Sequence, residues 1–363
     1  MKKIIILGST GSIGTQALEI IQANPEQFKV VGLVANTNRE LLAEQAAKFS
    51  VAADKAVIGA EAAVQLIEDT EGDVVINGIT GSIGLLPTLA TLKTGKTLAL
   101  ANKESLIVGG RLVTDLAKPG QIVPVDSEHS ALAQSLLAGT QSEVRKLILT
   151  ASGGPFRGFT KEQLKSVTPQ QALKHPTWTM GKAVTTNSAT MVNKGLEIIE
   201  AHLLFDVPFD RIAVTVHPQS VVHSMVEFVD GSIIAQCSPP DMKLPIALGM
   251  TWPNRIPNIS APVDFTQSHN WVFEPLDEDV FGAVRLAREV GNKGSTYPAV
   301  YNAANEQAVE AFHSNRITYL EILEIISEAI ENHKPESELT LESVLDAERW
   351  ARGFADQLIS KKH

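Results

Sequence analysis

The sequence predicts an α/β fold with an N-terminal Rossmann-like parallel sheet, a central α+β domain and a C-terminal helical bundle. Three observations carry this prediction. Short β-branched runs alternate with amphipathic stretches over residues 3–126, clusters of glycine, histidine, proline and tryptophan follow after about residue 150, and helical periods dominate from about residue 279. Apolar runs of about five residues separated by helical periods of about ten are typical of βαβ units in a doubly wound sheet.

The elements fall into four segments. Strands such as KIIIL and KVVGLVA alternate with helices such as TQALEIIQA in a first domain over 1–126, and strands such as RIAVTVH and GSIIAQC belong to a second over 127–252. A segment rich in proline and asparagine over 253–278 predicts a linker. The helical domain over 279–363 includes a helix that opens on a capping box formed by Thr318 and Glu321.

Composition narrows the class of protein. The 363 residues are 44% hydrophobic and carry a formal net charge of -10, which suits a globular protein with a large core. The acidic residues are dispersed, which argues against a nucleic-acid surface. Cys237 is the only cysteine, so no intramolecular disulfide can form and a reducing compartment, the cytoplasm, is expected. No apolar run approaches the length of a membrane span, so no membrane contact is expected.

Two glycine turns follow apolar strands and open helices. In the first, GSTGSIG, Gly8, Gly11 and Gly14 permit close approach of backbone N–H groups to a pyrophosphate at a helix N-terminus, although a plain strand-to-helix turn has the same appearance. The second turn, GITGSIG at 78–84, is expected to be a structural turn near the nicotinamide end. The loop after the second strand has no acid for a ribose hydroxyl, and Asn36, Asn38 and Arg39 favour NADP over NAD.

A pair of acids follows the last strand of the first domain, in PVDSEHS. In extended backbone Asp126 and Glu128 would project to one side, where two like charges require a cation between them, but such a pair also occurs in solvated loops and helix caps. A third acid, Glu197, lies in SATMVNKGLEIIE. Three carboxylates form a suitable partial shell for Mg²⁺ or Mn²⁺, with positions left for substrate oxygens.

Two further segments are unusual for loops. TASGGPFR offers Ser152 beside free backbone amides, a candidate phosphate or oxyanion nest. KHPTWTMGK places His175, Trp178 and Met180 between lysines. The tryptophan and methionine of this loop belong either to the core or to a lid that closes over a small substrate.

These segments, in this order, closely resemble the 1-deoxy-D-xylulose 5-phosphate reductoisomerase family. The resemblance spans essentially the whole chain and rests on GSTGSIG, ANKESL, PVDSEHS, SGGPFR, HPTW, SATMVNKGLE and HPQSVVHSMV, supported by DGS, WPNR and NAANE. It implies an NADPH- and divalent-metal-dependent enzyme that rearranges and reduces 1-deoxy-D-xylulose 5-phosphate, a small phosphorylated sugar, to 2-C-methyl-D-erythritol 4-phosphate in isoprenoid biosynthesis. A homodimer is a further implication.

The resemblance also implies roles for individual residues. The metal ligands would be Asp126, Glu128 and Glu197, and the catalytic residues Lys103, Glu128 and His175. The NADPH site would comprise Thr10, Gly11, Ser12, Ile13, Asn36, Thr37, Asn38, Asn102, Glu104 and Gly181. The substrate site would comprise Ser127, Glu128, Ser152, His175, Trp178, Ser188, Asn193, Lys194 and Glu197, with Trp178 and Met180 on the lid.

Two other functions fit parts of the pattern. A metal-assisted NADP-dependent hydroxy-acid dehydrogenase explains the glycine turn and the carboxylates, but it leaves the serine, asparagine and lysine set without a role. A redox-sensing regulator that binds NADP without turnover would not need three acids that converge on one site. Such a regulator also usually carries a basic DNA-reading module, which this sequence lacks.

Overall fold

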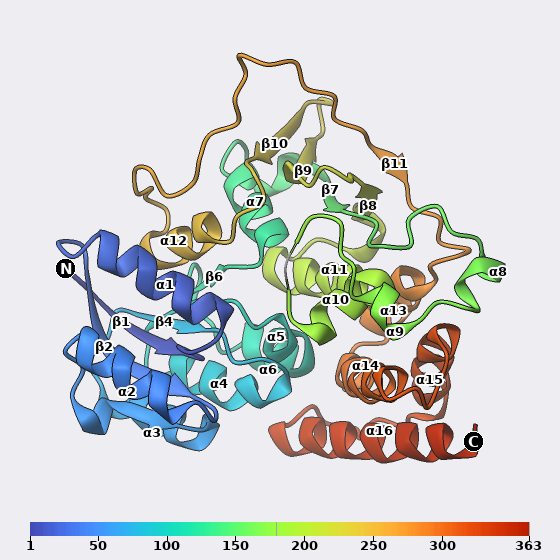
Figure 1. The fold of residues 1–363 in the computed structure, drawn as a ribbon, viewed down its shortest axis with the longest axis horizontal. Coiled ribbons are helices and arrows are strands. Elements are labelled where there is room, and N and C mark those ends of the chain that lie inside the picture. The colour runs from blue at the N-terminus through green and yellow to red at the C-terminus, as the bar shows by residue number, and fades with distance from the viewer. Residues whose placement is uncertain (179, 363) are drawn as a thin grey trace. The chain divides into compact units, whose positions relative to one another are not determined.

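The computed structural model describes residues 1–178 and 180–362, and the chain divides into two compact units (Figure 1). The N-terminal unit comprises Met1–Leu106, Val113–Gln134 and Asp241–Val263. The C-terminal unit comprises Ile107–Leu112, Ser135–Pro240 and Asp264–His363. Each unit therefore combines separate segments of the chain. The domains predicted with boundaries at 126, 252 and 278 are continuous stretches of sequence, and they stay a prediction.

A six-stranded parallel sheet forms the centre of the N-terminal unit. Its spatial order is β3-β2-β1-β4-β5-β6, which is the order of the doubly wound dinucleotide-binding fold. The strands are β1 (Lys2–Leu7), β2 (Phe28–Ala35), β3 (Ala56–Ile58), β4 (Val74–Asn77), β5 (Thr97–Leu100) and β6 (Ile122–Pro124). The chain order reverses between β1 and β4, so the carboxyl edge at these strands is where a ligand is expected.

Helices cover both faces of this sheet because alternate strand residues point to opposite sides. Ile4 and Ile6 of β1 lie in one apolar cluster, and Ile5 and Leu7 lie in the other. The first cluster contains residues of α1 (Ser12–Ala23), α2 (Arg39–Lys48) and α12 (Lys243–Thr251), and the second contains residues of α3 (Ala60–Asp69) and α4 (Leu85–Lys93). The β-branched runs thus form a sheet that is buried on both faces, as predicted.

Polar turns gather at the carboxyl edge of the same sheet. The first glycine turn follows β1, the second follows β4, and Asn102 and Asp126 come just after β5 and β6. At this edge α5 (Lys103–Gly109) begins after β5 and α7 (Ser127–Leu136) begins after β6, and α6 (Arg111–Thr114) follows α5.

The C-terminal unit contains a mixed sheet in the order β10-β9-β7-β8-β11. β7 pairs with β8 in parallel, and the other pairs are antiparallel. The strands are β7 (Val144–Ala151), β8 (Ile212–Val216), β9 (Val222–Phe228), β10 (Ile233–Cys237) and β11 (Glu274–Pro275). This sheet confirms the predicted α+β region.

Helices make up the rest of the C-terminal unit. Between β7 and β8 lie α8 (Lys161–Leu164), α9 (Pro169–Ala172), α10 (Lys182–Ala189) and α11 (Val192–Phe205). The predicted helical bundle is formed by α13 (Ala283–Lys293), α14 (Tyr297–His313), α15 (Tyr319–Asn332) and α16 (Leu341–Lys361). α14 contacts the other three helices of the bundle and buries Tyr301 and Phe312 completely (Figure 1). The capping box of Thr318 and Glu321 begins α15 as predicted.

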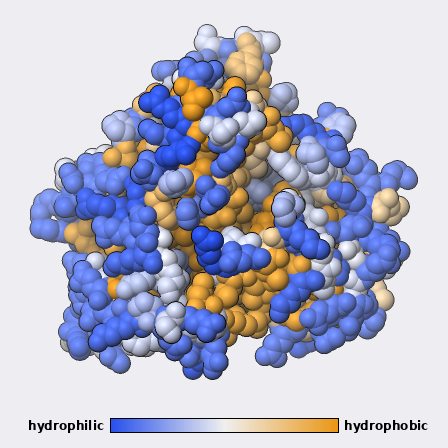
Figure 2. All heavy atoms as spheres, turned by 180° about the vertical axis from the view of Figure 1, so that it is seen from behind, coloured by the Kyte–Doolittle hydropathy of each residue, from blue (hydrophilic) through white to orange (hydrophobic). Residues whose placement is uncertain are grey.

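The surface is mainly polar. In Figure 2 hydrophilic residues dominate the outline of the face shown, and hydrophobic residues show toward its middle. None of the helices in residues 1–178 and 180–362 combines the length and the hydropathy that a membrane span requires.

Candidate active site

The first glycine turn is closed by contacts that leave no room for side chains. A Cβ atom at Gly14 would lie 2.4 Å from the carbonyl oxygen of Gly8, so α1 packs directly on the turn. Gly11 is the N-cap of α1 and supplies no side chain to the first helical N–H groups. Of the predicted residues Thr10 to Ile13, Ser12 and Ile13 place their backbone amides in the first turn of α1, whereas the N–H of Gly11 donates to the Gly8 carbonyl at 3.0 Å. Amides at a helix N-terminus suit an anion.

The predicted 2′-phosphate loop lies at the start of the neighbouring helix. Asn36, Thr37 and Asn38 are exposed after β2, and the Oδ1 atom of Asn38 accepts a hydrogen bond of 3.1 Å from the N–H of Leu41. Asn38 thus caps α2, which keeps the loop at a positive helix end. Farther along α2, the Nε2 atom of Gln45 donates to the carbonyl of Ser9 at 2.9 Å. This buried bond joins α2 to the glycine turn.

Asn102 holds the second glycine turn in place. Its Nδ2 atom donates to the carbonyls of Ile79 and Gly81, and its Oδ1 atom accepts from the N–H of Ser105 at 2.8 Å. The turn is therefore structural, and the side chain of Asn102 is committed to it. Lys103 and Glu104 follow in the first turn of α5.

A buried chain of hydroxyls and amides supports this corner. Asn77 donates to Thr88 at 2.9 Å, Thr88 lies 3.0 Å from the hydroxyl of Ser105, and Ser105 donates to the carbonyl of Asn102 at 3.0 Å. These residues were not predicted from the sequence. Their signal was a polar side chain inside each of the apolar runs VVINGI, LLPTLATL and ESLIVG.

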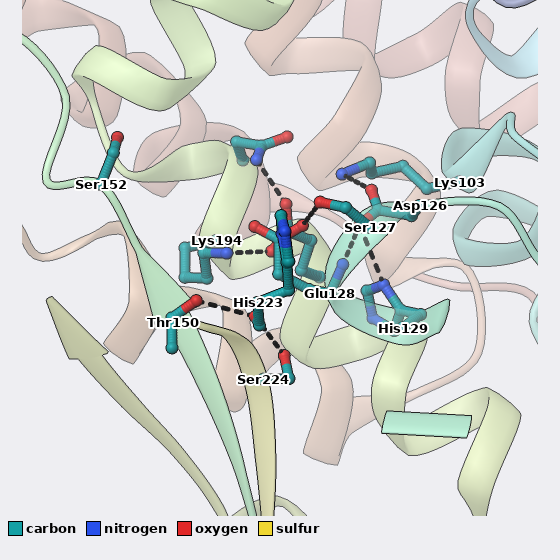
Figure 3. A network of polar contacts seen from close by, with 12 residues as sticks. Lys103, Asp126, Ser127, Glu128, His129, Thr150, Ser152, Lys194, His223 and Ser224 are labelled. Atoms are coloured by element: carbon teal, nitrogen blue, oxygen red, sulfur yellow. Dashed lines mark hydrogen bonds and ion pairs between the residues drawn. The ribbon is translucent and has the colours of Figure 1, made fainter. Parts of the chain in front are cut away.

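Asp126 is the electrostatic centre of the polar residues at the carboxyl edge of the N-terminal sheet. In Figure 3 the side chains of Lys103 and His129 are both directed at it, as an ion pair and as a contact of 3.3 Å from Nδ1 of the histidine. Burial raises the pKa of Asp126, but the Lys103 ammonium and the His129 ring outweigh burial and hold that pKa well below its ordinary range. The carboxyl is thus ionised at neutral pH. His129 is a further residue that the sequence analysis missed.

The backbone around the acid pair differs from the prediction. Asp126 and Glu128 were expected in extended backbone, but α7 begins at Ser127, so Glu128 lies in the first helical turn. The Ser127 hydroxyl donates to Glu128, and the N–H of Glu128 donates to Asp126 at 3.3 Å. The pair therefore belongs to a helix start, which favours negative charge through the helix dipole.

The C-terminal unit contains the third acid. Glu197 lies on α11, 1% exposed, and accepts hydrogen bonds from Asn193 and Lys194 of the same helix. Lys194 is itself 3% exposed, so its charge and that of Glu197 are buried as a pair. The spacing i, i+3 and i, i+4 places all three side chains on one face of α11.

The turn that follows Ser152 packs against the backbone of Ser188 through Gly154. Ser152 follows β7, and a Cβ atom at Gly154 would lie 2.9 Å from the carbonyl oxygen of Ser188, so the glycine turn rests directly on the end of α10. Asn193 and Lys194 follow a few residues later at the start of α11. The predicted phosphate-binding residues Ser152, Ser188, Asn193 and Lys194 thus lie around the junction of α10 and α11. This junction, together with the turn at Gly154, is called the elbow below.

The predicted lid is tied to the same elbow. His175 places Nε2 at 2.9 Å from the Ser152 hydroxyl, and its Nδ1 accepts from the N–H of Trp178 at 2.9 Å. Burial lowers the pKa of His175, so the ring is neutral at pH 7. Trp178 and Met180 are half-buried, and the ring of Trp178 lies 6.2 Å from that of His223. Gly181 is the N-cap of α10, just after the lid.

Comparison with known proteins decides the family. The model described as 1-deoxy-D-xylulose 5-phosphate reductoisomerase matches residues 4–55 and 51–110, and models of that family's C-terminal domains match residues 122–205 and 237–354. The chain is 61% identical to 1-deoxy-D-xylulose 5-phosphate reductoisomerase of Leifsonia xyli, over 99% of both chains. It belongs to this family.

Solved structures agree with the assignment. The chain matches the reductoisomerase of Zymomonas mobilis in complex with NADPH with a TM-score of 0.91 and 39% identity, over 99% of both chains. It also matches a reductoisomerase in complex with NADPH, fosmidomycin and magnesium, with a TM-score of 0.91 and 35% identity over 99% of this chain and 98% of that one. The predicted family, fold and enzyme class are thus confirmed, and the dehydrogenase and regulator alternatives are set aside.

Proposed function

We propose that the chain converts 1-deoxy-D-xylulose 5-phosphate to 2-C-methyl-D-erythritol 4-phosphate, with NADPH and a divalent cation, in isoprenoid biosynthesis. The observation that carries this proposal is the elbow, where Nε2 of the neutral His175 lies 2.9 Å from the Ser152 hydroxyl and the turn at Gly154 packs on Ser188. Asn193 and Lys194 follow at the start of α11. A phosphate dianion needs several donors and one positive charge in a fixed arrangement, and this elbow supplies both.

NADPH would bind along the carboxyl edge of the parallel sheet. The glycine turn fits a pyrophosphate because α1 meets it with no side chain between them, and the loop Asn36 to Asn38 fits the 2′-phosphate at the start of α2. Asn102, Glu104 and Gly181 would lie toward the nicotinamide. The cofactor supplies the hydride for the reduction.

Asp126, Glu128 and Glu197 would hold the divalent cation. The low pKa of Asp126 supports this role, because a ligand of a hard cation must be ionised. A cation in such a site chelates the carbonyl and the neighbouring hydroxyl of the substrate and stabilises negative charge that develops on them.

The remaining predicted residues would act around this centre. The Lys103 ammonium lies against Asp126 and would face the reacting oxygens together with the Ser127 hydroxyl. His175 would orient Ser152 toward the phosphate, while Trp178 and Met180 close the lid and exclude water. One enclosed site would then serve both the rearrangement and the reduction.

The test pairs binding with turnover. Glu128→Gln and Glu197→Gln should weaken Mn²⁺ binding, measured by calorimetry, and should each abolish metal-dependent NADPH loss with the phosphorylated sugar. Glu162→Gln changes an acid that is 80% exposed in the C-terminal unit and is the matched control, expected to leave both readouts unchanged. Full Mn²⁺ affinity and turnover in either site variant would remove that acid from the metal site.

We propose further that the enzyme is a homodimer that works in the reducing cytoplasm. A single cysteine and the use of NADPH support the compartment. For the dimer, β10 is an edge strand, and Ile233 and Ile234 on it are 50% and 40% exposed. Light scattering should report a dimer for the wild type and a monomer for Ile234→Lys; a wild-type monomer would refute the assembly.

A further inference from the structure

The helical bundle is bonded to the helix that precedes the phosphate elbow. The Nδ2 atom of Asn305 on α14 donates to Oδ1 of Asn187 on α10 at 3.0 Å. On either side of this bond, the Thr186 hydroxyl lies 2.7 Å from Nε2 of His313, and the Tyr319 hydroxyl donates to the carbonyl of Ala189 at 2.6 Å. Bonds to the bundle thus come from the residues directly before and after Ser188.

The amide pair is a buried restraint in which both partners are side chains. Asn187 and Asn305 are 7% and 1% exposed, so water does not replace the bond when it is lost. The Oδ1 atom of Asn305 has no hydrogen-bond partner within residues 1–178 and 180–362. The hydrogen bond from Nδ2 of Asn305 to Oδ1 of Asn187 is therefore what explains a polar side chain at this position in the core.

The backbone of the elbow is conformationally restricted. Between α10 and α11, Met191 adopts a left-handed conformation with φ of 63°, which a residue with a side chain keeps only where its surroundings enforce it. On the opposite side the turn at Gly154 rests on the backbone of Ser188 and Ala189. A shift of α10 would move Ser188 away from Asn193 and Lys194.

We propose that Asn305 is a positioning residue for recognition of the substrate phosphate. It fixes α10 through Asn187 and so sets the distance between Ser188 and the start of α11. Asn305 belongs to the NAANE run of the sequence, residues 302–306. The proposed role gives this run a function that does not require contact with the substrate. The inference rests on the proposed function, because it requires that Ser188 binds the phosphate.

A positioning role and a merely structural role differ in kinetics. A structural residue changes the amount of folded enzyme, which lowers the apparent kcat and leaves KM unchanged. A residue that sets the phosphate site raises KM for the phosphorylated substrate and spares the affinity for NADPH, because that cofactor is expected at the other unit's glycine turn. The phosphate group then contributes less to the binding energy of the substrate. The preference for 1-deoxy-D-xylulose 5-phosphate over 1-deoxy-D-xylulose therefore becomes smaller.

The experiment compares Asn305→Ala with Thr296→Val in the full-length enzyme. Thr296 is the matched control, because its hydroxyl lies 2.7 Å from Nε2 of His333 in a buried bond of the same bundle that does not touch α10. Asn305→Ala should raise KM for the phosphorylated sugar roughly five- to tenfold, as expected for one lost buried hydrogen bond, and reduce the preference for it by the same factor. Thr296→Val should change neither quantity.

Three further variants test the same bond and guard against a folding failure. Asn187→Ala combined with Asn305→Ala should be no worse in KM than Asn187→Ala alone, because both changes break one bond. If Asn305→Ala does not fold, Thr186→Val breaks a neighbouring bond to the bundle and should raise KM in the same manner.

Ser188→Ala distinguishes a failure of the positioning role of Asn305 from a failure of the proposed phosphate site. A raised KM in Ser188→Ala together with an unchanged KM in Asn305→Ala would overturn the positioning role and leave the proposed function standing. An unchanged KM in Ser188→Ala would remove Ser188 from the phosphate site and the positioning role with it. Equal effects of Thr296→Val and Asn305→Ala on KM would show that bundle stability alone is responsible, which also overturns the inference.

Discussion

Gly14 and Gly11 lie in the same glycine-rich segment, yet substitution by alanine should destabilise the protein at Gly14 and leave its stability nearly unchanged at Gly11. A Cβ atom at Gly14 would come within 2.4 Å of both the Gly8 carbonyl oxygen and the Cα atom of Ser9, and neither backbone atom can rotate away. Such overpacking costs about 3 kcal/mol at the upper end of the usual range. The better helix propensity of alanine returns about 1 kcal/mol. Gly14→Ala should therefore lower the free energy of unfolding by about 2 kcal/mol.

Gly11 is the control. A Cβ atom there would meet only the Gly8 carbonyl oxygen, at 3.3 Å, and its φ of -85° suits alanine. Gly11→Ala should thus stay within about 0.5 kcal/mol of the wild type in urea unfolding. Its added methyl group lies where the pyrophosphate is proposed to approach, so the Kd for NADPH should rise. A Gly14→Ala protein as stable as the wild type would refute the packing argument, and unchanged NADPH affinity in Gly11→Ala would refute the cofactor assignment of that turn.

Two other predictions concern stability. Thr88→Val keeps the shape of the side chain but deprives Asn77 and Ser105 of a buried partner, and it should lower the free energy of unfolding by about 2 kcal/mol; a value equal to the wild type would contradict the proposed chain of hydrogen bonds. Burial lowers three histidine pKa values below the ordinary 6.5, so the unfolded chain takes up protons first as the pH falls. The urea midpoint should therefore drop between about pH 7.5 and about pH 5.5, and a flat profile would exclude this linkage. The three residues are His175, His313 and His333.

Local patterns predicted the parallel sheet because each strand and helix carries its own periodicity. The alternation of Ile4 to Leu7 between two apolar clusters is a direct result of that pattern. The place of α12 on the same sheet was not predicted. Its sequence shows an apolar helix, but nothing local specifies that it packs against a sheet formed more than a hundred residues earlier.

The candidate site was predictable where a residue type implies its chemistry. Asp126, Glu128 and Glu197 were identified from their charge, and Ser152 from the glycines beside it. Asn305 was not identified, because its role depends on a contact with Asn187 across a long stretch of chain. His129 was not identified either, because the helix start that brings its ring to Asp126, three residues earlier, was not predicted. The extended backbone expected for PVDSEHS was wrong because the helix dipole and the Ser127 to Glu128 bond favour a helix start.

The most direct test of the central claim follows NADPH absorbance with 1-deoxy-D-xylulose 5-phosphate in the presence and absence of Mg²⁺, in wild type and in Lys194→Met. The account predicts rapid metal-dependent NADPH loss with 2-C-methyl-D-erythritol 4-phosphate as the product. Lys194→Met should raise KM strongly, because the buried ammonium beside Glu197 is the positive charge proposed for the phosphate. A folded wild type that binds NADPH yet leaves this substrate unchanged with Mg²⁺ or Mn²⁺ would contradict the account.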